Sequence, residues 1–151
     1  MAEWNNFLGF PIRRPSQDEE EFFRGRSDVN DLPNFVGAYA ADDNSIVLNP
    51  FVEMDPGMKR GLLMNEATRL HLRETEAGEL PFSLTPKQEE MFGGFPVGEK
   101  TLMDMQHSLI GRILSGDPNL PEVTSEQNMF AEEVFQQLVK RFKQYQKMWE
   151  K

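Results

Sequence analysis

The stretch NSIVLNPFVEMDPGMKRGLLMNEATRLHLR, residues 44–73, predicts a β-strand that leads into an α-helix. The apolar run at residues 46–48 is typical of a short strand, and Pro50 ends it because proline has no backbone N–H to donate within a sheet. Asp55 and Pro56 predict the start of the helix, since a carboxylate caps free N–H groups and proline is tolerated at the first helical position. We expect the rest of the chain to pack around this strand and helix.

A second strand is predicted directly before the first. Residues 35–39 form another apolar run, and the turn-forming sequence Ala-Asp-Asp-Asn at residues 41–44 separates it from the run at residues 45–48. Two apolar runs joined by such a short polar segment predict a β-hairpin.

Two capping boxes predict where later helices begin. In a capping box, the side chains of a Thr and of a Gln three residues later each accept a hydrogen bond from the other residue's backbone N–H. Thr85 with Gln88 predicts a short helix that starts at Pro86, and Thr124 with Gln127 predicts the start of the last helix. Apolar residues at helical spacing predict a further helix between these two, over residues 99–115.

The last helix has the longest periodic pattern in the chain. Six residues follow one another at alternating spacings of four and three, as in a heptad repeat: Ala131, Phe135, Leu138, Phe142, Tyr145 and Trp149. This helix would be roughly 35–40 Å long, which is more than a small domain needs. We therefore expect its far end to meet a partner, and the alternative is that it is simply the terminal helix of the core.

The first 34 residues are rich in aromatic residues but also in prolines, which prevent a continuous helix. We expect an extended N-terminal arm over residues 1–34. Its aromatic residues either lie on the surface of their own domain or dock on a neighbouring subunit, because exposed aromatic residues mark interaction surfaces. The candidate contact residues of the arm are Trp4, Phe7, Phe10, Phe22 and Phe23.

Together these patterns predict an α+β fold that is mainly α, in which a small β-hairpin packs on a helical core and a long amphipathic helix ends the chain. The expected division is an arm over residues 1–34, a compact α+β core over residues 35–122, and the long helix over residues 123–151. Candidate contacts on that helix are Phe142, Tyr145 and Trp149.

Composition excludes several function classes. The chain has 16 Lys and Arg against 25 Asp and Glu, a net charge of −9, and an acidic surface of this kind disfavours specific binding of nucleic acid. It has no cysteine, which excludes disulfides and thiolate metal sites. No segment has the roughly 20 apolar residues of a membrane span, and the first residues do not resemble a signal peptide.

Asn65, Glu66 and Arg69 form a polar cluster beside the apolar face of the predicted helix. Over residues 36–70 the order of strand, turn, strand and Glu-bearing helix resembles the zincin metallopeptidases. In that family the helix carries His-Glu-x-x-His, in which two His bind zinc and the Glu activates the bound water. Here Asn65 and Arg69 occupy the ligand positions, and neither residue binds zinc well.

His71 does not replace the missing ligands, because two positions along a helix turn it away by about 200°. We therefore expect no metal, no other cofactor and no catalytic residue, and we expect the cluster to be structural, its charges paired with each other or with Asp42 and Asp43. The alternative is a hydrolase-like protein or a peptide-binding module that uses Glu66 and Arg69.

Over residues 34–127 the chain also resembles a group of small proteins encoded by tailed, especially short-tailed, bacteriophages. The similar segments are FVGAYAADDNSIVLNPF, LLMNEATRLHLRE, FSLTPKQ and IGRILSGDPNLPEVTSEQ. The resemblance implies a non-catalytic structural or interaction protein of the virion or of its assembly, located in the virion or the host cytoplasm. Its expected partners are other protein subunits, either copies of itself or phage proteins.

Overall fold

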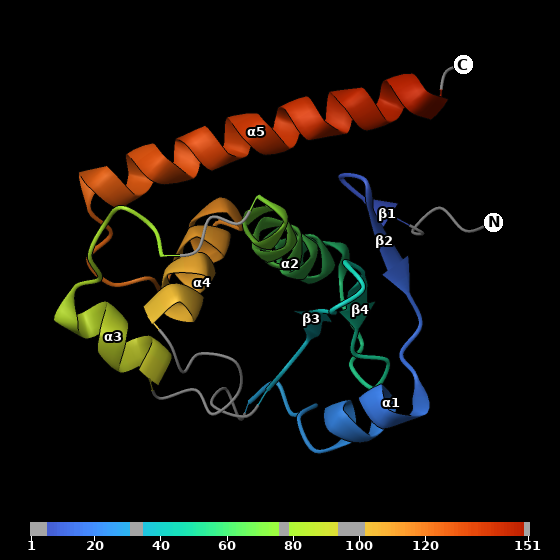
Figure 1. The fold of residues 1–151 in the computed structure, drawn as a ribbon. Coiled ribbons are helices and arrows are strands. Elements are labelled where there is room, and N and C mark those ends of the chain that lie inside the picture. Colours follow the sequence, from blue (N-terminus) through green and yellow to red (C-terminus); the bar gives the residue numbers. More distant parts are fainter. Residues whose placement is uncertain (1–5, 31–34, 76–78, 94–101, 150–151) are drawn as a thin grey trace.

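The computed structural model describes residues 6–30, 35–75, 79–93 and 102–149 (Figure 1). In these ranges the chain forms four strands and five helices, in the order β1 (Asn6–Phe7), β2 (Phe10–Arg13), α1 (Gln17–Arg24), β3 (Ala38–Ala40), β4 (Ile46–Leu48), α2 (Pro56–Glu74), α3 (Pro86–Gly93), α4 (Leu102–Leu114) and α5 (Ser125–Trp149). The prediction of a mainly α, α+β fold with a small hairpin and a long last helix is confirmed.

Helix α2 lies at the centre of the molecule and begins where the sequence predicts. The Asp55 carboxylate accepts a hydrogen bond from the N–H of Met58 at 2.8 Å, and Pro56 is the first helical residue. One face of α2 buries Leu63, Ala67 and Leu70 against the sheet. The strand-to-helix unit predicted from residues 44–73 is therefore confirmed.

The sheet is larger than the predicted hairpin, because residues near the N-terminus join it. Strands β3 and β4 pair antiparallel as predicted, and β2 pairs in parallel with β4 on its other side, with Ile12 opposite Ile46. Strand β1 pairs antiparallel with β2. The turn between them is tight, since Leu8 and Gly9 both have positive φ, as in the two-residue turns that match the twist of a hairpin.

Residues 6–24 thus differ from the extended arm that the sequence predicts over residues 1–34. The reason is burial. Phe10 packs against the apolar face of α2 and is only 1% exposed, and Phe23 is fully buried beside Val47. Transfer of each such side chain out of water contributes about 2–3 kcal/mol, which favours a folded segment over a free arm.

An ion network fastens helix α1 to the sheet. The guanidinium of Arg13 donates two hydrogen bonds to the Glu19 carboxylate, at 2.6 and 2.9 Å, and a third to Asp43 at 3.0 Å. Tyr39 donates its hydroxyl to the same Glu19 carboxylate. These contacts join β2, α1, β3 and the hairpin turn. The charge-assisted pair with Arg13 is the main reason that the pKa of Glu19 is lowered to about 2.

Helices α2 and α4 approach each other closely at Gly111. A Cβ atom at this position would lie 2.1 Å from the side-chain oxygen of Asn65 and 3.1 Å from its main-chain oxygen. A larger residue here would therefore require the Asn65 side chain to move and the backbone of the two helices to shift by a few tenths of an ångström.

Helix α5 crosses over α4 and α2, and its C-terminal half passes over β1 and β2, while α1 lies on the far side of the molecule from it (Figure 1). Both predicted capping boxes are confirmed, at the start of α3 and of α5. The face of α5 toward the core consists of Gln127, Ala131, Val134 and Leu138. Phe135 and Phe142, which the heptad pattern groups with Ala131 and Leu138, are instead exposed.

Candidate functional site

The predicted polar cluster lies between α2 and α4. Glu66 is 5% exposed, and its carboxylate accepts a hydrogen bond from Asn65 at 3.4 Å and lies 3.8 Å from the Nε of Arg69. Arg69 also donates to the hydroxyl of Ser108 on α4. The expected pairing of Glu66 with Arg69 is present, and Ser108, which the sequence did not single out, is its partner on the neighbouring helix.

The hairpin turn is held by a different residue from the predicted ones. Arg73, one turn beyond Arg69, donates to the carbonyl oxygens of Ala41 at 2.9 Å and of Ala40 at 3.2 Å. Asp43 pairs with Arg13. The cluster of Asn65, Glu66 and Arg69 therefore fastens α2 to α4, and Arg73 fastens α2 to the hairpin.

The geometry of the cluster does not reproduce the zinc site of a metallopeptidase. His71 points away from Glu66 toward α5, where its Nε2 forms a hydrogen bond of 2.7 Å with the Oε1 of Gln137. Across the described ranges, no three His, Asp or Glu side chains come together in a way that could hold a metal ion. Among the helices that the structure describes, none is both long and apolar enough to cross a membrane.

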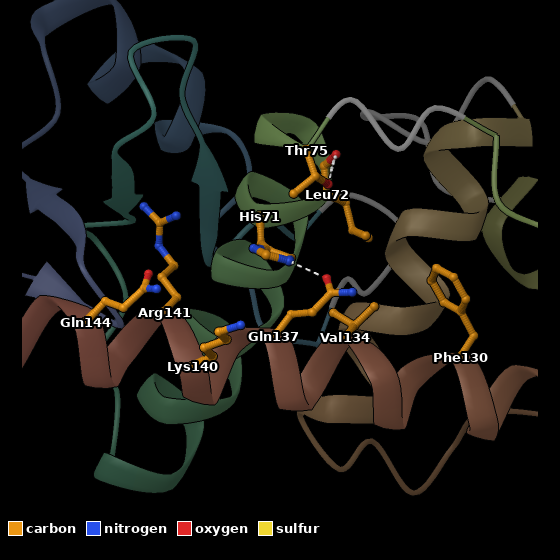
Figure 2. A pocket seen from close by; sticks show the side chains of 9 residues that line it. All are labelled: His71, Leu72, Thr75, Phe130, Val134, Gln137, Lys140, Arg141 and Gln144. Atoms are coloured by element: carbon orange, nitrogen blue, oxygen red, sulfur yellow. Dashed lines mark hydrogen bonds between the residues drawn. The ribbon is translucent and has the colours of Figure 1, made fainter.

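An open groove of about 490 Å³ runs between the C-terminal half of α2 and α5 (Figure 2). Its walls are His71, Leu72, Thr75, Phe130, Val134, Gln137, Lys140, Arg141 and Gln144. The hydrogen bond between His71 and Gln137 spans it. Arg141 closes one end of the groove. Its Nη1 lies 2.8 Å from the Oε2 of Glu74, and its Cζ lies 4.0 Å from the centre of the Phe10 ring. Contacts across the groove therefore hold α5 against α2 and β2.

The structure separates the predicted contact residues into two groups. Phe10 and Phe23 are buried in the core, and Phe7 and Phe22 are partly buried against it, so these four aromatic side chains hold the chain's own fold together. Phe142 is 36% exposed. Trp4 and the side chains of Tyr145 and Trp149 fall outside the part of the chain that the structure describes.

Phe142 belongs to an apolar strip on the flank of α5 away from the groove, which we call the outer stripe. It consists of Phe135, Val139 and Phe142, of which the two aromatic residues are 38% and 36% exposed and Val139 is half-buried. Glu132 and Lys143 are exposed beside it. An apolar strip rimmed by charge is the usual form of a protein-binding surface.

No protein-family model, curated protein or solved structure matches the chain.

Proposed function

We propose that the protein is a non-catalytic interaction protein that binds other protein subunits through the outer stripe of α5. The observation that carries this proposal is the position of Phe135 and Phe142. The face of α5 formed by Ala131, Val134 and Leu138 packs in the core, whereas the two aromatic residues lie outside this face and keep more than a third of their surface exposed. Phenylalanine is among the residue types that are enriched in protein interfaces relative to the rest of the surface.

The sequence context agrees with this role. Resemblance to small proteins of tailed bacteriophages favours a component of the virion or of its assembly, in which subunits bind one another. The N-terminal residues, which were the other predicted contact region, contribute less to this binding surface, because Phe10 and Phe23 are buried in the protein's own core.

The surroundings of Glu66 support the non-catalytic part of the proposal. A general base must reach a water molecule or a substrate with its carboxylate. Glu66 is 5% exposed, accepts a hydrogen bond from Asn65 and is paired with Arg69, so its carboxylate serves the contact between α2 and α4.

Photo-crosslinking tests the proposal, because it links the chain covalently to whichever protein lies against the outer stripe. The crosslinking amino acid p-benzoylphenylalanine is placed at residue 135, and at residue 129 as the control, in the full chain expressed in its natural setting. Met129 is the matched position because it is an apolar residue of α5, 70% exposed and outside the outer stripe. We expect discrete crosslinked proteins, identified by mass spectrometry, from position 135 and not from position 129.

Equal, diffuse labelling from both positions would overturn the proposal. Hydrolysis of peptides or cell-wall fragments that is lost in Glu66→Gln would overturn its non-catalytic part.

A further inference from the structure

We infer that the partner of the outer stripe is a second copy of this chain, whose α5 lies antiparallel to the first. This inference rests on the proposed function and names the partner. It is carried by two features of α5: the position of the apolar residues within the stripe, and the distribution of charge along the helix.

The stripe has the symmetry that a self-complementary contact requires. Phe135 and Phe142 are seven residues apart, which is two helical turns or about 10.5 Å along the axis, and Val139 lies between them. In a two-fold dimer, residue i contacts residue j of the other chain and j contacts i. A two-fold axis beside Val139 would place Phe135 of each chain against the partner's Phe142 and bring the two Val139 side chains together.

The charges of α5 are divided between its two halves. The first half carries Glu126, Glu132 and Glu133 and no cation, whereas the second half, up to Trp149, carries Lys140, Arg141, Lys143 and Lys147 and no carboxylate. An antiparallel pair brings the acidic half of each helix beside the basic half of the other. A parallel pair would bring like charges together, which is unfavourable.

The two opposite charges nearest to the stripe, Glu132 and Lys143, also lie on the same side of it. Glu132 and Lys143 lie at about 60° and 80° from Phe135 around the helix axis, toward solvent. Glu132 lies 6.5 residues before the midpoint of Phe135 and Phe142, and Lys143 lies 4.5 residues after it. In the antiparallel pair, Glu132 and the partner's Lys143 are therefore offset by only about 3 Å along the axis. Glu132 accepts a hydrogen bond from Gln136 in its own helix and remains exposed for this contact.

Light scattering coupled to size-exclusion chromatography measures the first consequence. The full chain should have twice its mass of 17.4 kDa, and Phe135→Ser with Phe142→Ser should return it to 17.4 kDa while the circular dichroism spectrum stays unchanged. Met129→Ser is the control and should leave the dimer intact. A wild-type chain that is monomeric at its highest soluble concentration overturns the inference.

Single cysteines define the arrangement, because the natural chain has none. Under mild oxidation, Val139→Cys should form a disulfide-linked dimer, and Glu133→Cys, on the opposite flank, should not. An equimolar mixture of Phe135→Cys and Phe142→Cys should give mainly the mixed dimer. If each of these two variants links mainly to itself, the helices are parallel and the inference is wrong.

Charge reversal tests the ion pair itself. Each of Glu132→Lys and Lys143→Glu should raise the dissociation constant by about tenfold, since two pairs per dimer become repulsive, and the double variant should restore the wild-type value. Unchanged dissociation constants in both single variants would contradict the inferred register.

These outcomes are distinct from failure of the proposed function. A monomeric chain that still crosslinks from position 135 to a different protein would retain the interaction role and remove only the second copy as partner. A chain that is monomeric and forms no specific crosslink would remove both.

Discussion

The side-chain amides of Gln88 and Gln127 bind each other in both directions, each Nε2 donating to the other residue's Oε1 at 2.8 Å. Both residues are fully buried. Each Oε1 also accepts from the backbone N–H that its own capping box requires, and each Nε2 also donates to a loop carbonyl, of Pro121 or of Ser83. The starts of α3 and α5 are thus joined by one hydrogen-bonded unit in which both amides are fully used.

Replacement of either glutamine by methionine should destabilise the protein by about 1–3 kcal/mol, because methionine has a similar volume but leaves the buried amide of the other glutamine without its partner. Urea unfolding of Gln88→Met, Gln127→Met and the double variant measures the effect. The double variant should cost less than the sum of the two single variants, since each single change already removes the shared contacts. Gln136→Met on the exposed face of α5 is the control, and strict additivity would show that the two amides are not coupled.

Gly111→Ala should destabilise the protein by about 1–3 kcal/mol, although alanine favours a helix over glycine by about 1 kcal/mol. The added Cβ would lie 2.1 Å from the side-chain oxygen of Asn65 and 3.1 Å from its main-chain oxygen, so the Asn65 side chain must move and the two helices must shift slightly apart. Gly61→Ala in α2 is the matched control, because its Cβ would meet nothing nearer than 4.0 Å, and we expect it to raise the melting temperature. A Gly111→Ala variant as stable as Gly61→Ala would contradict the close helix contact.

Glu19 should make stability depend on pH in the acidic range. Its pKa is about 2 in the folded protein, against an ordinary value of 4.5, mainly because of the hydrogen bonds from Arg13. A lowered pKa contributes stability above pH 4.5, and the contribution is lost as pH falls from 4.5 toward 2. Because Arg13 is partly exposed to solvent, we expect only about 1–2 kcal/mol.

The measurement compares urea unfolding of the wild type and Glu19→Gln at several pH values. The difference between them should be largest at neutral pH and should shrink below pH 4.5, with Glu21→Gln as the exposed control on the same helix. A difference that stays constant down to acidic pH would mean that the pair with Arg13 does not contribute.

Phe23→Ala should cost about 3–5 kcal/mol, because the ring is fully buried against β4 and its removal leaves a cavity. Phe51→Ala is the comparison: this residue is 43% exposed and lies under the guanidinium of Arg24, so its loss should cost under about 1 kcal/mol. If Phe23→Ala proved as mild as Phe51→Ala, residues 17–24 would be an arm, as the sequence alone predicts, and not part of the core.

The parts of this fold that could be predicted from the sequence depend on neighbours along the chain. Asp55 with Pro56 and the two Thr-to-Gln capping boxes give helix starts that the structure confirms, because capping involves residues three apart. The hairpin of β3 and β4 is also local.

The parts that could not be predicted depend on distant segments. The pairing of β2 with β4 joins residues 34 positions apart, and the aromatic residues near the N-terminus have no period that reveals it. On α5, Phe135 and Val134 are equally apolar, and only the position of α2 and α4 determines which one is buried. The role of Ser108 in the polar cluster likewise carries no sequence signal.

The parallel pairing of β2 with β4 also determines what an N-terminal truncation would do. In the intact protein β4 has a neighbour on each side, and so its backbone N–H and C=O groups are satisfied on both. A chain that starts after residue 24 would leave one side of β4 open beside the apolar residues Ile46 and Val47. Open strand edges recruit strands from other molecules, so we expect such a shortened chain to aggregate during synthesis. Aggregation of that kind would be mistaken for the loss of a partner-binding arm.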